Sequence, residues 1–142
     1  MQLLRTDSMP YIAGAFYVRT QAMAVKHSIP LEREFDEKDG PGTRYIVALD
    51  GVLPVATCRL YPIGEDTMLI GRVVVLPEYR RRGLGTRVVL EAEAWARDLG
   101  MGRCIVDGRD NKLDFYTSLG YKVEGELRHE GTFATVRMGK TL

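Results

Sequence analysis

The fold of this chain is decided by one stretch, Val73-Val74-Val75-Leu76-Pro77-Glu78-Tyr79-Arg80-Arg81-Arg82-Gly83-Leu84-Gly85-Thr86. It begins as a β-branched run that is typical of a buried strand, and this run ends at a proline. A short basic loop with two glycines follows, and an amphipathic helix begins after it. Backbone N–H groups at a helix start, surrounded by arginines, form a site for an anion such as a diphosphate.

The residue types in this loop suit a phosphate ligand. Gly83 and Gly85 let phosphate oxygens approach the backbone and permit positive φ. The arginines at 80–82 supply forked, charged donors, and Thr86 adds a hydroxyl in the first helical turn. The spacing matches neither the G-x-G-x-x-G fingerprint nor the G-x-x-x-x-G-K-[ST] loop. The alternative interpretation is a basic surface loop that merely precedes a helix.

Composition bounds the class of protein. The 142 residues fit one domain, residues 1–142, and the hydrophobic (45%) and charged (27%) fractions are those of an ordinary soluble protein. The net charge of +1 argues against a nucleic-acid partner. The sequence shows no membrane span and no signal-peptide pattern. Cys58 and Cys104 lie in strand-like segments, which predicts buried, reduced thiols, a cytoplasmic location and no metal site.

The hydrophobic periodicity predicts an α/β chain (an α+β mixed sheet) with helices on both faces. Strands are expected over 2–7, 44–49, 52–61, 67–76 and 104–106, helices over 10–26, 84–99 and 110–119, and a closing hairpin over 121–127 and 132–138. The hairpin turns at Glu130-Gly131, and residues 27–42 form a long loop. Helical spacing within 84–99 places Trp95 in the core.

Two segments carry a resemblance to a known family. The spacing Arg80-x-x-Gly83-x-Gly85 resembles the acyl-CoA diphosphate loop of the GNAT superfamily of N-acetyltransferases. The segment Phe115-Tyr116-Thr117-Ser118-Leu119-Gly120-Tyr121 is similar to the F-Y-x-x-x-G-[FY] segment that closes the acyl-CoA site. The element order matches the GNAT fold over nearly the whole chain. The resemblance implies an N-acetyltransferase that uses acetyl-CoA as cosubstrate, acetylates an amine of a small molecule or protein, and can form a homodimer.

A third segment resembles, in part, a marker of the ElaA-like branch. It reads Arg19-x-x-Ala22-Met23-x-x-Lys26-x-x-Ile29-Pro30-x-x-x-Glu34-x-Asp36-x-x-Asp39, with Met23 and Lys26 in place of an aromatic residue and a glutamate. The branch also carries a histidine three residues before a C-terminal methionine, where this chain has Thr135 before Met138. A CoA-binding module without turnover is therefore the alternative. A signal synthase shares the acidic E-x-D pattern but needs a longer chain.

The resemblance also implies roles for site residues. It places the pantetheine arm along Val73–Val75, where backbone groups pair with its amides and the N–H of Val73 or Val74 donates to the thioester carbonyl. It places Phe115 and Tyr116 beside the thioester, with the Tyr116 hydroxyl as general acid. A phenol with a pKa of ~10 is protonated at neutral pH and can donate to a thiolate. The alternative for Tyr116 is a packing role.

The general base is assigned from the acidic segment. Glu32, Glu34 and Asp36 alternate with other residues, so an extended backbone would place the three carboxylates on one face. Such a face can bind a cationic amine and accept its proton, and we assign the base to Glu34. The alternatives are a solvated acidic loop, or a base at Glu65 or Asp66 before the central strand.

Five further residues have competing interpretations. Asn111 either caps the helix expected over 110–119 or bonds the pantetheine arm. Arg72 interrupts an apolar strand, and it either pairs with an acidic residue across the sheet or reaches the acceptor. Arg109 contacts either the ligands or solvent. His27 and His129 lie beside loops and are taken as exposed residues.

Overall fold

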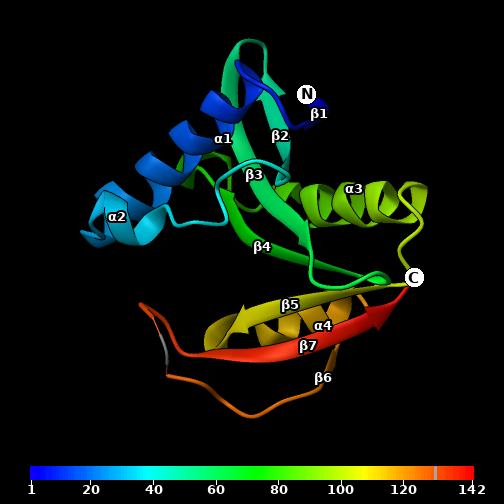
Figure 1. Ribbon diagram of the computed structural model, residues 1–142. Helices are drawn as coiled ribbons and strands as arrows, with labels where there is room; N and C mark the ends of the chain where they lie inside the picture. The colour runs from blue at the N-terminus through cyan, green and yellow to red at the C-terminus, as the bar shows by residue number, and fades with distance from the viewer. Residues whose placement is uncertain (130) are drawn as a thin grey trace.

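The computed structural model describes residues 1–129 and 131–142, and these form a seven-stranded sheet in the order β1-β2-β3-β4-β5-β7-β6 (Figure 1). The strands are β1 (Gln2–Thr6), β2 (Arg44–Asp50), β3 (Leu53–Pro62), β4 (Thr67–Val75), β5 (Arg103–Arg109), β6 (Lys122–Val123) and β7 (Thr135–Thr141). Among the described strands, β4 and β5 form the one parallel pair, and all other neighbours are antiparallel. The mixed sheet that the sequence predicts is therefore confirmed.

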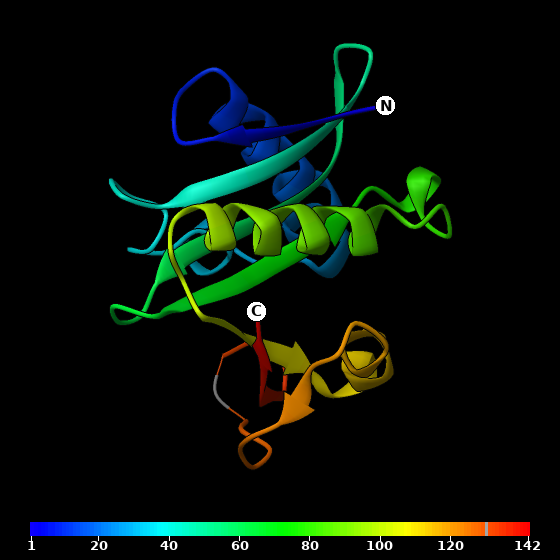
Figure 2. The same cartoon turned by 90° about the vertical axis from the view of Figure 1, so that its right-hand side faces the viewer.

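Helices lie on both faces of this sheet (Figures 1 and 2). They are α1 (Tyr11–Arg19), α2 (Leu31–Glu34), α3 (Leu84–Asp98) and α4 (Leu113–Ser118), with a π-helical turn η1 (Thr20–Val25) and the 3₁₀ turns η2 (Pro77–Tyr79) and η3 (Asp110–Lys112). Tyr45 of β2 meets Phe16 of α1 edge-on, with 5.7 Å between ring centroids. Cys58 of β3 instead lies with its Sγ 3.5 Å from the carbonyl oxygen of Val88 in α3. Alternate side chains of the central strands thus face different helices.

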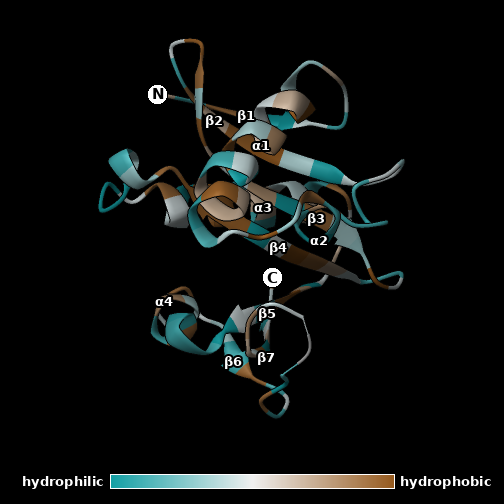
Figure 3. Cartoon of the chain, turned by 90° about the vertical axis from the view of Figure 1, so that its left-hand side faces the viewer, coloured by the Kyte–Doolittle hydropathy of each residue, from teal (hydrophilic) through white to brown (hydrophobic). Residues whose placement is uncertain are grey.

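The packing of α3 follows from its apolar periodicity. The buried apolar residues of this helix are Leu84, Val88, Val89, Ala92 and Ala96. They pack on the central strands, and β4 is brown along most of its length in Figure 3. The core position predicted for Trp95 is only partly right, because its ring is half-buried with the guanidinium groups of Arg5 and Arg44 at 5.8 and 5.6 Å. The buried face of α3 ends before its C-cap, since the Leu99 side chain at that position is 39% exposed.

A β-bulge interrupts the pairing of β3 with β4. Thr57 is opposite Val74, whereas Arg59 is opposite Gly71, so β4 contains one extra residue between these pairs. Arg72 lies in this bulge with φ of 49°, in the left-handed region that non-glycine residues seldom adopt. The bulge bends β4 just before Val73–Val75.

Beyond the bulge, β4 and β5 separate. Their parallel pairing covers only Thr67–Ile70 and Arg103–Val106, although β4 continues to Val75 and β5 to Arg109. Figure 1 shows the two strands diverging toward their carboxyl ends. The inner edge of β4 past Ile70 therefore has no strand partner within the described residues. This separation, which we call the splay, organises the candidate site.

Three segments differ from the sequence-based expectations. The long loop predicted over 27–42 contains the helical turn α2. The strand predicted over 121–127 is reduced to Lys122–Val123, and its partner β7 starts at Thr135 rather than at 132. A single bridge, Arg128 to Thr135, continues the hairpin. The turn predicted at Glu130-Gly131 falls partly on residue 130, which lies outside the described residues.

The two cysteines match the prediction, because both are buried and free. Burial raises the pKa of the Cys104 thiol to about 12 and raises that of Cys58 further. Within residues 1–129 and 131–142, no helix has both the length and the apolar character needed to cross a membrane.

Candidate active site

The basic loop presents a helix start without a protein cap. Gly83 is the N-cap of α3 with φ of 76°, and no side chain of the described residues bonds the first turn. The N–H groups of Leu84, Gly85 and Thr86 therefore lack intrahelical partners. The three arginines at 80–82 are exposed beside this turn, and Arg81 also has a positive φ of 63°. Free N–H groups, the helix dipole and guanidinium groups together can bind an anion.

Three contacts that the sequence analysis missed hold this loop. The Tyr79 hydroxyl donates to Asp50 Oδ2 at 2.6 Å, and the guanidinium of Arg82 lies 4.7 Å from the centre of the Tyr79 ring. Arg80 Nε donates to the carbonyl oxygen of Val75 at 3.3 Å. The sequence did mark both partners of the hydrogen bond, because Tyr79 lies in the stretch 73–86 and Asp50 lies in the predicted hairpin turn.

The structure places Val73, Val74 and Val75 on the splayed part of β4. Val74 is buried with 5% exposure, and its two neighbours are half-buried. On the β3 side this segment is paired, since Val74 is opposite Thr57 and Val75 is opposite Ala56. The opposite edge faces the splay and offers backbone N–H and C=O groups to an extended ligand.

Helix α4 closes one side of this arrangement. A Cβ placed on Gly85 would lie 3.5 Å from Cζ of Phe115 and 4.0 Å from Cγ2 of Val75. The start of α3, the splayed end of β4 and the start of α4 thus meet at Gly85. The structure therefore brings together the three groups of residues that the resemblance assigns to acyl-CoA.

Tyr116 lies next to Phe115 in a largely apolar setting. Its side chain is 8% exposed, and its ring packs edge-on against Phe115 and Tyr121 with centroids at 5.0 and 5.9 Å. Its hydroxyl donates to no protein group in the described part of the chain. Burial raises the pKa of Tyr116, and the nearby Cys58 raises it further. The hydroxyl therefore stays protonated at neutral pH and retains its donor for a ligand.

Asn111 and Arg109 lie at the far end of β5. The capping role considered for Asn111 is wrong, because no side chain caps η3 or α4 and Asn111 is exposed in η3. The guanidinium of Arg109 lies 3.8 Å from the centre of the Phe133 ring. Phe133 also contacts His27 edge-on, with 5.8 Å between centroids. Phe133, which sequence reasoning missed, therefore bridges the two sides of the splay.

The acidic segment does not have the expected geometry. Leu31–Glu34 forms a helical turn after Pro30, so the prediction that Glu32, Glu34 and Asp36 share one extended face is wrong. Glu32 is exposed, Asp36 is half-buried, and Glu34 is 4% exposed. The inward position of Glu34 has an electrostatic cause, because the buried guanidinium of Arg19 needs a negative partner and forms an ion pair with the Glu34 carboxylate.

Arg19 is the centre of a buried ion-pair network. Its Nε donates to Glu34 Oε2 at 3.0 Å, and its Nη1 donates to Asp39 Oδ1 at 2.7 Å. Arg59 Nη1 lies 2.8 Å from Asp36 Oδ1 and 3.1 Å from Asp39 Oδ2. Burial alone would raise the pKa of Asp39, but the hydrogen bond and charge of Arg19 lower it well below its usual range.

Arg72 extends this network toward the splay. Its Nη2 lies 3.3 Å from Asp36 Oδ2, and its Nε lies 3.6 Å from Glu34 Oε2. The interpretation that Arg72 pairs with acidic residues is therefore confirmed, although both partners lie in or just after α2 and not in a strand of the sheet. Its side chain nevertheless remains 32% exposed.

The second candidates for the base lie elsewhere. The backbone oxygen of Asp66 accepts the N–H groups of Gly102 and Arg103, at the paired end of β4 and β5. Glu65 is exposed beside it. This end is opposite the splay, so neither carboxylate joins the other candidate residues. His129 is exposed in the segment before β7.

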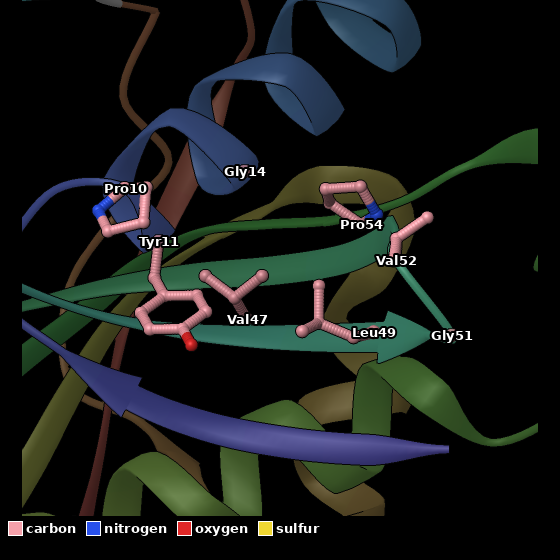
Figure 4. Close-up of a pocket in the computed structure, with 8 residues that line it drawn as sticks. All are labelled: Pro10, Tyr11, Gly14, Val47, Leu49, Gly51, Val52 and Pro54. Carbon is pink, nitrogen blue, oxygen red and sulfur yellow. The ribbon is translucent and has the colours of Figure 1, made fainter.

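The hollows in the surface also lie elsewhere. A pocket of about 330 Å³ lies between α1 and the β2–β3 hairpin (Figure 4), and another of about 320 Å³ lies beside β6 and β7. The first is lined by Pro10, Tyr11, Gly14, Val47, Leu49, Gly51, Val52 and Pro54. These side chains carry no charge, and neither pocket includes a predicted site residue. The site is therefore assigned from the splay, the basic loop and α4.

Comparison with known proteins agrees with this geometry. The family model of the Acetyltransferase (GNAT) family matches residues 11–121. The chain belongs to the GNAT family of acetyltransferases. A relative, the uncharacterized N-acetyltransferase YjcF of Bacillus subtilis (strain 168), is 30% identical over 115 residues, which cover 81% of each chain. The GNAT fold and the acetyltransferase class predicted from the sequence are thus confirmed.

Solved structures share the whole GNAT fold. The crystal structure of a "putative N-acetyltransferase" from Lactobacillus plantarum has a TM-score of 0.94 at 30% identity, over 99% of this chain and 97% of the other. Escherichia coli ElaA has a TM-score of 0.85 at 18% identity, over 99% of both chains. The second likeness concerns the fold alone, so membership of the ElaA-like branch stays a prediction.

Proposed function

We propose that this GNAT protein transfers the acetyl group of acetyl-CoA to a primary amine by direct attack of the amine on the thioester. The observation that carries the proposal is the meeting of three parts at Gly85: an uncapped, arginine-flanked helix start, the open edge of β4, and the Phe115-Tyr116 pair. Each part suits a different portion of the same ligand. The two buried, free cysteines support a cytoplasmic location.

The cosubstrate would be held mainly by backbone groups. The diphosphate would accept from the N–H groups of residues 83–86 and from the arginines at 80–82. The pantetheine arm would lie along Val73–Val75 as an additional strand, pairing its amides with the open edge of β4. The exposed amide of Asn111 is available to the same arm. Phe115 would supply an apolar wall beside it.

The reaction needs a polarised carbonyl and a stabilised leaving group. In the proposed step the amine nitrogen forms a bond to the carbonyl carbon, and the bond from that carbon to sulfur breaks. The N–H of Val73 or Val74 would donate to the carbonyl oxygen, where negative charge develops. The Tyr116 hydroxyl would donate to the departing thiolate. Because the pKa of Tyr116, raised by burial, lies above that of a thiol, the hydroxyl keeps its proton and stabilises the thiolate by this hydrogen bond. CoA leaves as the thiolate and takes its proton from solvent.

The amine must lose a proton, and Glu34 is our proposed acceptor for it. Its Oε2 is bound to Arg19, but Oε1 has no hydrogen-bond partner among residues 1–129 and 131–142. The carboxylate is nearly buried, so the proton would reach Oε1 through a water molecule. Glu34→Gln then lowers kcat with little change in KM. A rise in KM with kcat unchanged would instead assign Glu34 to positioning Arg72.

The first test is thermal unfolding with and without acetyl-CoA. At 100 times its Kd the ligand stabilises the protein by ~2.7 kcal/mol, or roughly 5–10 °C in Tm. Gly83→Glu places a negative charge at the helix start and should abolish the shift. Gly100→Glu is the matched control, because Gly100 has φ of 86° and open space around it like Gly83, but lies past the other end of α3. It should keep the shift.

Thiol release on addition of amines then separates an enzyme from a CoA-binding module, which the missing C-terminal histidine motivates as the alternative. An unchanged Tm at saturating acetyl-CoA would contradict both functions. A normal shift without thiol release for any amine would favour the module.

A further inference from the structure

Arg72 occupies a strained position beside the proposed reaction centre. It has φ of 49° in the bulge of β4, and a non-glycine residue is held there only when its surroundings compensate for the strain. It directly precedes Val73, so their Cα atoms are about 3.8 Å apart. The side chain of Arg72 therefore starts next to the proposed carbonyl site.

The partners of Arg72 leave part of its guanidinium unused. Nε donates to the backbone oxygen of Glu34 at 3.2 Å, and Nη2 donates to Asp36 Oδ2 at a long 3.3 Å. Nη1 has no partner in the described part of the chain. The side chain is 32% exposed, so part of it remains open to a ligand.

Arg72 belongs to a network of three arginines and three carboxylates in which some guanidinium donors are unused. Arg59 is 4% exposed, and its buried Nε has no partner among the described residues. Burial lowers the pKa of Arg72, and the charge of Arg59 lowers it further, against the opposing effect of Glu34 and Asp36. An added negative charge at Arg72 would therefore be stabilised.

Each of the nearby carboxylates already has an arginine partner. Glu34 accepts from Arg19, and Asp39 accepts from Arg19 and from the hydroxyl of Tyr45 at 2.8 Å. Asp36 is bound by Arg59 at 2.8 Å. A polycationic acceptor would have to compete with these guanidinium groups. A ligand with a negative group instead finds unused donors.

We propose that the acceptor is a small amine that also carries a carboxylate a few bonds from its nitrogen, and that Arg72 binds this carboxylate. The inference rests on the proposed function and names its substrate class. The same positive charge favours the neutral, nucleophilic form of the bound amine. Arg72 would thus set acceptor specificity without taking part in proton transfer.

The test compares amines in matched pairs by thiol release. Each amino acid, such as glycine, phenylalanine or γ-aminobutyrate, is assayed beside its amide or its carboxylate-free amine, and spermidine represents polycations. We expect kcat/KM to be at least about tenfold higher for the acid of a productive pair. Arg72→Gln should remove this preference, mainly through a 10- to 100-fold rise in KM, estimated as roughly the loss of one charged hydrogen-bonded pair.

Two further variants isolate the role of the guanidinium. Arg72→Lys retains the positive charge but lacks the forked donors of a guanidinium, so it should recover part of the preference for carboxylate-bearing amines. Arg33→Gln removes the same charge from an exposed residue of α2 and should leave it unchanged. The acetyl-CoA shift in Tm confirms that each variant folds.

The outcomes separate this inference from the proposed function. Acetylation of carboxylate-free amines or spermidine at equal or higher efficiency overturns the inference and retains the N-acetyltransferase. The inference is also overturned if Arg72→Gln lowers kcat/KM equally for the acid and for its carboxylate-free partner. Absence of thiol release with every amine overturns both.

Discussion

The Tyr79 hydroxyl donates to Asp50 Oδ2 over 2.6 Å, and this bond ties the arginine-rich loop to the tip of the β2–β3 hairpin. The Tyr79 ring lies beneath the guanidinium of Arg82. The hairpin therefore fixes the Tyr79 ring, against which the guanidinium of Arg82 packs. The loop is held in place before any ligand arrives.

Removing this bond should affect binding more than folding. Tyr79→Phe keeps the ring under Arg82 but releases Asp50, so we expect a rise in the Kd for acetyl-CoA of less than about fivefold and little change in Tm, as for other exposed polar contacts. Titration of acetyl-CoA by calorimetry measures this. Asp50→Asn should give a similar rise, and the double variant should add little to it. Fully additive effects would show that the two residues act independently.

Gly85→Ala should change stability and binding in opposite directions. A Cβ at Gly85 meets Phe115 at an ordinary contact distance of 3.5 Å, and alanine favours the helix over glycine by up to about 1 kcal/mol. The Tm without ligand should therefore rise by roughly 1–3 °C. The added methyl narrows the approach of the diphosphate to the backbone, so the Kd for acetyl-CoA should rise at least about tenfold. Unchanged affinity would place the diphosphate away from this turn.

Tyr116→Phe should slow turnover without weakening the binding of acetyl-CoA. The ring contacts with Phe115 and Tyr121 persist, whereas the hydrogen bond to the leaving thiolate is lost. We expect kcat to fall by roughly 10- to 100-fold, the value of a hydrogen bond to a charged group. Equilibrium binding of acetyl-CoA should stay within about twofold of wild type, as only the proposed transition-state contact changes. A normal kcat would assign Tyr116 to packing.

Asp39 should make stability sensitive to acid. Because Arg19 holds the folded-state pKa of Asp39 below the unfolded value of ~3.9, its contribution is present above that value and is lost as the pH falls below about 4. Asp39→Asn breaks a buried ion pair and should lower the free energy of unfolding by about 3 kcal/mol at pH 7. It should also flatten the loss of stability between about pH 4 and 2.

Denaturant titrations across this pH range give the comparison. Asp98→Asn is the control, because Asp98 forms an exposed pair with Arg5 in which the Asp98 side chain is 66% exposed. Its effect should stay below about 1 kcal/mol. An acid dependence that is equally steep in Asp39→Asn and wild type would contradict the role of this pair.

The local sequence pattern was sufficient to predict those elements whose structure is determined within one segment of the chain. The helix start at Gly83, the strand before it and the buried face of α3 follow from glycine placement and apolar spacing within residues 67–98. The resemblance of the loop and of Phe115-Tyr116 then indicated the family. These elements were predicted because no distant residue decides them.

Distant partners decided what could not be predicted. Glu34 turns inward because Arg19, fifteen residues earlier, is buried and needs a counter-charge. Phe133 meets His27 because the fold places the segment before β7 against the segment after η1, which lies far away in the sequence. The bulge at Arg72 is a matter of register between strands, and a single-strand pattern does not contain it. The acceptor side of the site consists mainly of such contacts.

The open edge of β4 also bears on how the protein avoids aggregation. Proteins usually cover or charge a bare strand edge, because it is a template on which a strand of another molecule can assemble. In the proposed complex, covering this edge with the protein's own chain would exclude the acyl donor, and the donor itself would complete the sheet. The supply of donor would thereby influence the colloidal stability of the protein as well as its rate of reaction.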